Sequence, residues 1–433
     1  MVRQLDSALP EFGEAFEELL ASKRAEEFDV DAVVREIIAE VRVRGDQALI
    51  DYSKRFDKVD LDSVGIRVAR DEIVRALDEI DPETMAALEL AHDRLIAHHE
   101  RQIPKDDRYT DAEGVELGTI WKPVESAGLY VPGGTASYPS SVLMNAVPAK
   151  VAGVDRVAMT VPAPKGVLNP LVLGAAHISG VDEIYRVGGA QAVAALAYGT
   201  ETIAPVDKIV GPGNAYVAAA KKMVFGDVGI DMIAGPSEVL IVADGDNDAD
   251  WIAADLLAQA EHDASAQSIL MSDDADFAKA VAEAVDRQLA TLPRGNIAAA
   301  SWEKHGAIIC LTDLNEAPPL VDRIAPEHLE IATADPEDLM GRIRNAGAIF
   351  LGRYTPEVIG DYVAGSNHVL PTARSARFSS GLGVLDFMKR SSLLRLDKAA
   401  LEKLGSAAMR LAKAEGLEAH SRSVGVRFGE RPW

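Results

Sequence analysis

The sequence predicts an α/β protein built on two mainly parallel sheets, and two observations lead to this class. Short β-branched apolar runs alternate with alanine-rich stretches of helix length, a pattern typical of βαβ units and buried parallel strands. The chain also has 433 residues, which is too long for one hydrophobic core, so two large domains are expected. The clearest strand candidates are residues 156–161, 208–210, 238–243, 267–272, 307–312 and 348–351.

Both ends of the chain are predicted to be helical. Residues 30–56 place apolar side chains three and four positions apart, as amphipathic helices do. From residue 381 onward the pattern is helical again and ends in a polar tail. Between these ends, residues 130–237 form one predicted set of βαβ units and residues 238–380 form the other.

Charge and cysteine content narrow the possible partners and compartment. The formal net charge is −24, from 44 basic and 68 acidic residues, and such a balance repels phosphate backbones and anionic membranes. We therefore expect no nucleic acid and no membrane partner.

Cys310 is the single cysteine, which fits a reducing compartment. The first residues lack the apolar core of a signal peptide, and no apolar run reaches the ~18 residues of a membrane span. The expected location is cytoplasmic.

Nucleotide-binding motifs are absent from the sequence. Gly211 and Gly213, like Gly381 and Gly383, have the first spacing of G-x-G-x-x-G, but neither pair has glycine at the sixth position. Glycine-rich stretches at 133–134, 188–189 and 211–213 could let the backbone approach a dinucleotide closely, or they could simply form turns.

A candidate metal site begins on the predicted helix 248–267, with Asp248 as its N-cap. Asp255, Gln259 and His262 are spaced i, i+4 and i+7, which places them on one helical face. Gln259 and His262 could ligate one ion, with Asp255 orienting them. The alternative is a set of solvated or locally satisfied polar side chains.

Two other segments could complete such a site. Asp361 and His368 lie in a glycine-rich stretch, predicted as a loop after a strand, and the spacing does not decide between them. Glu415 and His420 lie at the end of an alanine-rich helix. A surface histidine stabilised by the helix dipole is the alternative for His420.

Glu327 and His328 form a candidate acid–base pair. They follow Pro326, and proline suits the start of a helix, so we expect both side chains in a first helical turn. An imidazole titrates near neutral pH, and a partly buried carboxylate can act as a base. The alternative is an ordinary first turn in which the glutamate complements the helix dipole.

Nine segments together resemble the histidinol dehydrogenase family, in that family's order and over nearly the whole chain. They are residues 128–154, 187–200, 208–217, 231–240, 255–263, 325–331, 360–372, 376–384 and 414–420. The resemblance implies two incomplete Rossmann-like domains and a homodimer with shared active sites. The implied domains are an N-terminal segment 1–25, a larger α/β domain 26–129 with 238–380, an NAD-binding domain 130–237, and a C-terminal segment 381–433 that reaches the partner subunit.

The resemblance also implies roles for individual residues. One zinc ion per subunit would be held by Gln259, His262, Asp361 and His420, with His420 coming from the partner subunit, so Asp361 rather than His368 is the implied ligand. Glu327 and His328 would be the catalytic pair. The implied substrate contacts are Ser237, Gln259, His262, His328, Asp361, Glu415 and His420, and the implied NAD contacts are Tyr130, Gln191 and Asn214.

The expected reaction is the oxidation of L-histidinol through L-histidinaldehyde to L-histidine with two NAD, the last steps of histidine biosynthesis. Zinc would orient the substrate, His328 would take the hydroxyl proton, and Glu327 would activate water. Two other functions use the same residues: a metal-dependent hydrolase, and a non-enzymatic protein that binds amino acids or metal.

Overall fold

The structure is a computed structural model that describes residues 2–22, 30–133, 138–233 and 235–431. The chain forms two compact units, one of residues 1–102 with 124–387 and the other of residues 103–123 with 388–433. Within the described ranges, no helix is both long and apolar enough to cross a membrane.

The first unit contains a six-stranded parallel sheet in the order β1-β11-β10-β9-β12-β13. From β9 onward, the strands follow the 3-2-1-4-5 order of a Rossmann fold that lacks its sixth strand. The strands are β1 (Arg3–Asp6), β9 (Glu238–Ala243), β10 (Gln267–Ser272), β11 (Ala307–Cys310), β12 (His328–Ala332) and β13 (Ala348–Leu351).

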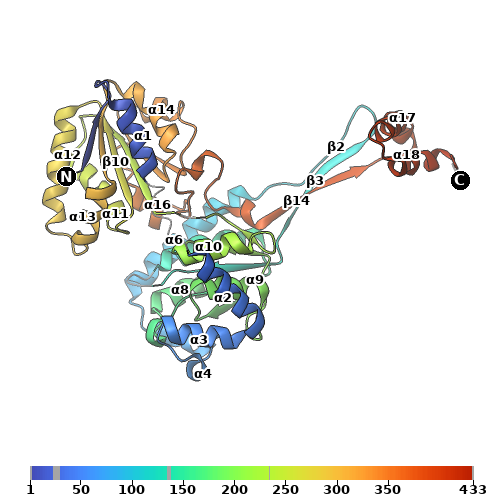
Figure 1. Cartoon of the computed structure of the whole chain (residues 1–433), viewed down its shortest axis with the longest axis horizontal. Coiled ribbons are helices and arrows are strands. Elements are labelled where there is room, and N and C mark those ends of the chain that lie inside the picture. Colours follow the sequence, from blue (N-terminus) through green and yellow to red (C-terminus); the bar gives the residue numbers. More distant parts are fainter. Residues whose placement is uncertain (1, 23–29, 134–137, 234, 432–433) are drawn as a thin grey trace. The chain divides into compact units, whose positions relative to one another are not determined.

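Helices cover both faces of this sheet (Figure 1). On β9, Val239 and Ile241 pack toward one group of helices, whereas Leu240 and Val242 pack toward the other. The central strand is therefore apolar on both faces, as expected for a buried parallel sheet. The helices of the first group are α11 (Ala249–Ala260), α12 (Ala275–Leu289) and α13 (Gly295–His305), and those of the second are α1 (Phe12–Ser22) and α14 (Ala317–Ile324).

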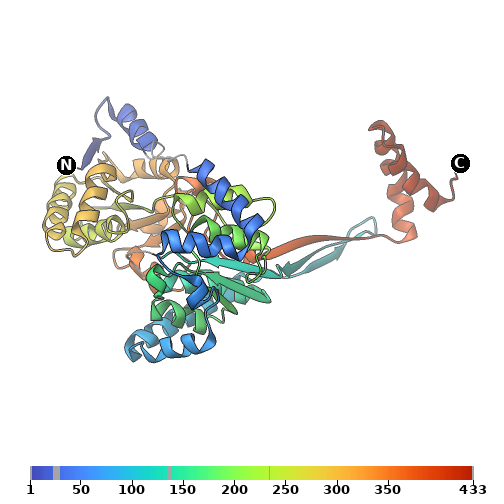
Figure 2. The same cartoon turned by 60° about the horizontal axis from the view of Figure 1, so that its bottom comes forward.

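A second parallel sheet in the same unit has the order β6-β5-β4-β7-β8 and again follows the 3-2-1-4-5 pattern, with helices on both faces (Figure 2). The prediction of two incomplete Rossmann-like sheets is confirmed. The strands are β4 (Ser126–Tyr130), β5 (Arg156–Thr160), β6 (Glu183–Tyr185), β7 (Lys208–Val210) and β8 (Gly229–Ile230). The connecting helices are α7 (Pro139–Ala152), α8 (Pro170–Ile178), α9 (Gly189–Tyr198) and α10 (Ala215–Val224).

The helices near the N terminus pack differently from the predicted grouping of residues 26–129 with 238–380. Val34 and Val41 on α2 share a core with Val193 and Leu196 on α9, and α5 and α6 contact α8 and α7. Residues 3–6, predicted as part of a helical segment, form an edge strand of the first sheet because they pair with β11. These helices are α2 (Asp31–Arg44), α3 (Asp46–Phe56), α4 (Leu61–Val64), α5 (Arg70–Asp78) and α6 (Pro82–His99).

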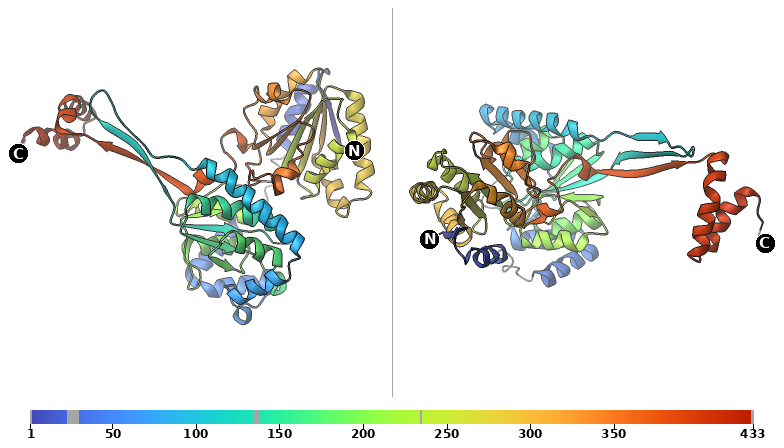
Figure 3. Two further views of the ribbon diagram at one scale, coloured as in Figure 1. Left: turned by 180° about the vertical axis from the view of Figure 1, so that it is seen from behind. Right: turned by 90° about the horizontal axis from the view of Figure 1, so that it is seen from above.

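The second unit consists of an antiparallel sheet in the order β14-β3-β2 and two helices that pack together (Figure 3). The sheet was not predicted, because β2 and β14 are largely exposed and lack the apolar alternation that marks a strand. Its elements are β2 (Asp107–Thr110), β3 (Glu116–Pro123), β14 (Met388–Arg395), α17 (Lys398–Ala414) and α18 (Glu418–Gly425).

The central strand β9 should dominate the stability of the first sheet. Ile241 is fully buried there, whereas Ile349 on the edge strand β13 is 38 % exposed. We expect Ile241→Ala to lower the free energy of unfolding by about 2–5 kcal/mol, and Ile349→Ala to lower it by about 1 kcal/mol or less. Urea denaturation followed by circular dichroism measures both. Equal losses for the two variants would contradict this assignment of the core.

Candidate active site

Glu327 and His328 lie at the start of a strand, so the prediction of a helical first turn is wrong. Helix α14 ends at Ile324, and Ala325 adopts a left-handed conformation with φ 48° and ψ 62°. His328 then pairs in parallel with Val239 of β9 and Ala348 of β13. Proline is compatible with the entry to a strand as well as with the start of a helix, and pairing with both neighbouring strands decides the outcome here.

The pair is fixed to the first residue of the neighbouring strand. The Glu238 backbone N–H donates to Glu327 Oε2 at 2.8 Å, and His328 Nδ1 lies 3.0 Å from the Glu238 carbonyl oxygen. Both site side chains are buried, with 5 % and 3 % of their surface exposed. The site therefore lies at the amino edge of the first sheet, opposite to the carboxyl edge at which open α/β sheets usually bind ligands.

These contacts set the tautomer of His328. A carbonyl oxygen only accepts hydrogen bonds, so Nδ1 carries a proton, and any proton that the ring gains or loses is bound at Nε2. Nε2 has no hydrogen-bond partner among the described residues and lies 3.3 Å from Asp361 Oδ1. His328 can therefore take up or release a proton at Nε2, which faces Asp361.

Buried carboxyl groups surround this ring. Burial raises the pKa of Glu327 to about 7. Burial alone would lower the pKa of His328, but Glu357, whose Oε2 lies 3.7 Å from Nδ1, acts with Glu327 and Asp361 to raise it well above its ordinary value. Burial also raises the pKa of Glu357. The raised pKa values mean that these groups hold protons near neutral pH more readily than usual, which keeps the net charge of the cluster low.

Asp255 lies near another buried carboxyl group, that of Glu330. Burial, and then the charge of Asp255, raise the pKa of Glu330 to about 8, and burial raises that of Asp255 to about 6. Glu330 Oε1 accepts the backbone N–H of Glu357 at 2.6 Å. Asp255 thus belongs to the carboxyl groups behind His328, and its role as an orienter of Gln259 and His262 stays a hypothesis.

Gln259 and His262 come together at the end of α11. The helix ends at Ala260, so His262 lies in the following turn and not on the predicted helical face. Its backbone N–H donates to the Gln259 carbonyl oxygen at 3.2 Å, and Gln259 Nε2 lies 3.3 Å from His262 Nδ1. Burial lowers the pKa of His262, which favours the neutral ring that binds metal.

Asp361 lies in the short helix α16 (Glu357–Tyr362) and not in a loop. Burial opposes its ionisation, but the His328 ring, whose Nε2 lies 3.3 Å from Oδ1, holds the pKa of Asp361 below the ordinary value. The predicted loop begins after this helix and holds His368, whose Nδ1 donates to the Asp361 carbonyl oxygen at 3.0 Å. Asp361 thus offers a carboxylate to the site, while the ring of His368 fixes its backbone.

The residues present fit a metal ion with mixed ligands. Gln259 is fully buried, yet its Oε1 has no hydrogen-bond partner among the described residues, and an unpaired buried carbonyl is costly unless something binds it. His262 supplies an imidazole and Asp361 a carboxylate. No cluster of three or more His, Cys, Asp or Glu suited to a metal occurs in the described part of the chain. The amide of Gln259 would therefore have to complete the set.

Two contacts that position the site were not predicted. Arg94 on α6 donates to the Val363 and Ala364 carbonyl oxygens at 2.6 and 2.9 Å, two and three residues after Asp361. Asn367 donates to the Met144 carbonyl oxygen at 2.6 Å. These residues are far from each other in sequence, and no local pattern indicates that they meet.

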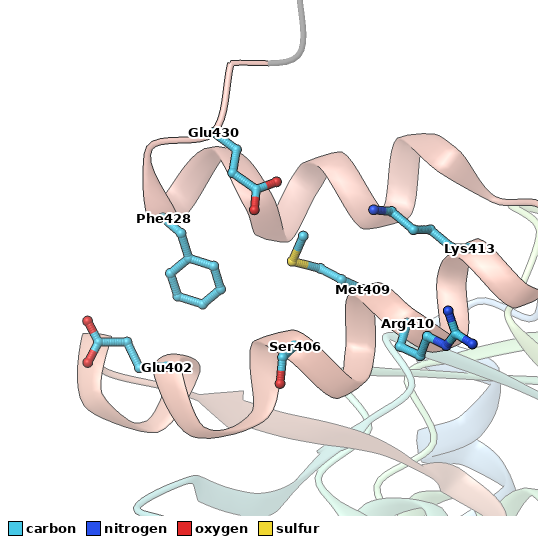
Figure 4. A pocket seen from close by; sticks show the side chains of 7 residues that line it. All are labelled: Glu402, Ser406, Met409, Arg410, Lys413, Phe428 and Glu430. Atoms are coloured by element: carbon cyan, nitrogen blue, oxygen red, sulfur yellow. The ribbon is translucent and has the colours of Figure 1, made fainter.

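The other predicted substrate contacts lie in two places. Ser237 is half-buried and directly precedes β9, one residue before Glu238, whose backbone contacts the candidate pair. Glu415 and His420 belong to the second unit, where both are exposed at the end of α17 and on α18. A pocket of about 510 Å³ in this second unit, shown in Figure 4, contains none of the predicted site residues.

The predicted NAD contacts lie at the carboxyl edge of the second sheet. Tyr130 ends β4, and its hydroxyl accepts the Gly189 backbone N–H at 3.1 Å. Tyr130 and Gln191 are 4 % and 2 % exposed. Asn214 is exposed and caps α10 by accepting two backbone N–H groups. The neighbours β4 and β7 form the point where strand order reverses, the usual ligand position in such sheets.

Packing accounts for two of the glycines here. A Cβ on Gly133 would lie 2.4 Å from Pro162 Cγ, and a Cβ on Gly188 would lie 2.5 Å from Pro162 Cβ. Both glycines therefore let neighbouring loops meet, which favours the interpretation of loop packing at these positions. Gly134 lies outside the described residues.

Comparison with known proteins points to one family. The family model for histidinol dehydrogenase matches residues 20–428. The histidinol dehydrogenase of Mesorhizobium japonicum is 68 % identical over 427 residues, covering 99 % of both chains, and that of Brucella suis is 66 % identical, covering 99 % of this chain and 100 % of its relative.

The chain belongs to the histidinol dehydrogenase family. The crystal structure of histidinol dehydrogenase from Elizabethkingia anophelis superposes with a TM-score of 0.94 at 35 % identity, covering 99 % of this chain and 98 % of that one. The resemblance found in the nine sequence segments is confirmed, and the similarity covers the described sheets and helices of this family member.

Burial of Glu327 should make stability depend on pH in a defined direction. Its pKa is about 7 in the folded protein against an ordinary 4.5, so the native state binds more protons between these values. The stabilisation that the folded protein gains from the protonated Glu327 is fully present below about pH 4.5 and is lost as the pH rises through about 7. The free energy of unfolding of Glu327→Gln, relative to that of the parent, should therefore rise by about 2 kcal/mol from pH 5 to pH 8.

Urea denaturation of the metal-free protein at both pH values measures this difference. The matched control is Glu283→Gln, at an exposed position on α12, for which the difference from the parent should be the same at pH 5 and pH 8. A Glu327→Gln variant that shows no pH-dependent gain would contradict the assigned burial of the carboxyl group.

Proposed function

We propose that this chain oxidises L-histidinol through L-histidinaldehyde to L-histidine with two NAD, the last steps of histidine biosynthesis. In the same proposal it acts in the cytoplasm as a homodimer with one zinc ion per subunit and shared active sites. The observation that carries the proposal is the buried ring of His328, whose Nδ1 lies 3.8 Å from the buried carboxyl group of Glu327 and whose Nε2 has no hydrogen-bond partner among the described residues. The names of its relatives support the substrate.

His328 would act as the base in both oxidations. Its Nδ1 proton is held by the Glu238 carbonyl, so the ring can take the alcohol proton at Nε2 without changing tautomer. The carboxylates around the ring stabilise the imidazolium that results. When bound, NAD accepts the hydride and zinc orients the substrate.

Glu327 would activate water for the second step. With a pKa of about 7, part of this group is ionised near neutral pH and can take a proton from the water that attacks the aldehyde, giving a gem-diol. A cysteine route is disfavoured here. Cys310 ends β11, at the carboxyl edge of the sheet, whereas Glu327 and His328 lie at the amino edge. Burial also raises the pKa of this thiol, which makes it a poor nucleophile.

Zinc would be held by Gln259, His262 and Asp361, with His420 of the partner subunit as a fourth ligand. The unpaired Gln259 Oε1 supports this set. Ser237 and Glu415 would complete the substrate contacts together with His328 and the metal ligands. Two exposed residues of the second unit would thereby gain partners on assembly.

NAD would bind at the carboxyl edge of the second sheet, near Tyr130, Gln191 and Asn214. Helix α9 has no side chain at its N-cap, and such a helix start favours a pyrophosphate group. Asn214 uses its Oδ1 as a helix cap, so its amide nitrogen is available to a ligand.

The NADH yield per histidinol tests the reaction. The parent should form two NADH for each histidine. Glu327→Gln should slow the aldehyde oxidation by ~100-fold or more, as loss of a general base does, with a smaller effect on the alcohol step. Single-turnover absorbance at the NADH wavelength, with histidinol or histidinaldehyde as substrate, separates the steps.

Cys310→Ser is the matched control and should keep both steps. Loss of only its aldehyde step would show that the thiol takes part. A hydrolase acting at this site would form no NADH, and a binding protein would take up histidinol without turnover and would be unaffected by Glu327→Gln. Either result would reject the proposed function.

Zinc content tests the ligand set. Gln259→Leu and His420→Ala should each lower bound zinc by about 10-fold or more, because each removes a ligand. His98→Ala, at an exposed position on α6, is the control and should retain zinc. Metal analysis after dialysis at fixed free zinc gives the result, and unchanged zinc in His420→Ala would remove that residue from the set.

A further inference from the structure

Lys221 and Asp231 form a buried ion pair below the carboxyl edge of the second sheet. Their side chains are only 3 % and 1 % exposed. Lys221 lies on α10, and Asp231 directly follows β8. A buried ion pair contributes little net stability compared with apolar residues of similar size. Stability alone therefore does not explain two charges at this position.

Both partners bind the backbone of one residue, Gly211. Lys221 Nζ donates to the Gly211 carbonyl oxygen at 2.9 Å, and the Gly211 N–H donates to Asp231 Oδ2 at 2.8 Å. Gly211 has φ +114°, and a Cβ there would lie 2.1 Å from the Tyr130 carbonyl oxygen. Its backbone is thus fixed by two charged side chains and by close contact with β4.

Gly211 is the first residue of the turn between β7 and α10. The turn, residues 211–214, ends at Asn214, whose Oδ1 accepts the N–H groups of Tyr216 and Val217 at 3.1 and 3.2 Å. Fixing Gly211 therefore fixes where the exposed Asn214 and the first turn of α10 lie. This turn is beside the point where strand order reverses in the second sheet, the usual position for a ligand.

We propose that Lys221 and Asp231 are positioning residues that hold the turn 211–214 in the conformation that binds NAD. This inference rests on the proposed function, which places NAD at this turn. Without the pair, the buried N–H and C=O groups of Gly211 lose their hydrogen-bond partners. They can then form hydrogen bonds with water only if the turn moves toward the solvent. The position of Asn214 would then change, although no residue that touches the cofactor is altered.

Two double variants separate the loss of hydrogen bonds from the loss of charge. Lys221→Met with Asp231→Leu removes both hydrogen bonds to Gly211, whereas Lys221→Gln with Asp231→Asn keeps a donor and an acceptor without charge. We expect the first variant to bind NAD at least about tenfold more weakly, as loss of buried hydrogen bonds does. The second should stay within about threefold of the parent. The KM for histidinol should change less than twofold in both variants.

Three measurements make the result decisive. Isothermal titration with NAD gives the affinity, thermal unfolding shows that each variant is folded, and hydrogen exchange reports the protection of residues 211–217. Lys222→Met, at the adjacent exposed position, is the control and should leave all three unchanged. The proposal is overturned if the first variant binds NAD as the parent does, or if both variants lose affinity equally.

Failure of the proposed function would appear differently. A parent protein that does not bind NAD would reject the cofactor assignment, whereas hydrogen exchange at residues 211–217 would still show whether the ion pair fixes the turn. Increased exchange in the first variant, with NAD affinity unchanged from a binding parent, would show that the pair shapes the turn but does not position the cofactor.

Discussion

The catalytic geometry depends on one constraint, the parallel pairing of β12 with β9 at their amino ends. This register places Glu327 and His328 beside the first residue of β9. The two polar groups of the Glu238 backbone are then used by the site, the N–H by Glu327 Oε2 and the carbonyl oxygen by His328 Nδ1. Backbone atoms of a central strand move little. The tautomer of His328 and the position of the Glu327 carboxyl group are therefore set before any ligand binds.

The two sheets of the first unit share one strand order but use opposite edges. In the second sheet, the predicted cofactor residues follow the carboxyl ends of β4 and β7, as the Rossmann order favours. In the first sheet, the proposed catalytic pair lies at the amino end of β12. In both, a single backbone residue is held through its N–H and C=O groups, Glu238 at one edge and Gly211 at the other. The rigid edges of the sheets thus fix where the site residues lie, whereas charged or titratable side chains would bind ligands and transfer protons.

Burial without full pairing gives the site its reactivity. Gln259 Oε1, His328 Nε2 and Glu357 Oε2 all lack hydrogen-bond partners among the described residues. Unpaired buried polar atoms destabilise the protein unless a ligand or a proton binds them. Glu357 Oε2 lies 3.7 Å from the ring of His328, in a region where burial raises carboxyl pKa values, and such a cluster is typical of a functional site rather than of a structural core.

The sequence by itself determined the fold class, most strands and the residues with chemical capacity. Apolar runs of β-branched residues gave 208–210, 238–243, 267–272 and 348–351 with the bounds that the structure has, because burial on both faces requires such runs. Sequence analysis also selected Gln259, His262, Glu327, His328 and Asp361, which the structure gathers in the first unit.

Only the tertiary structure decided how those residues meet. Pro326 suits a helix or a strand, and pairing with β9 and β13 selected the strand. His262 left the predicted helical face because α11 ends two residues before it. Arg94, Glu357 and the Lys221–Asp231 pair were not found because each acts on segments distant in sequence. Local patterns report which face of an element is buried, whereas long-range contacts depend on how the elements pack, and packing fixes the tautomers, pKa values and turns on which the chemistry depends.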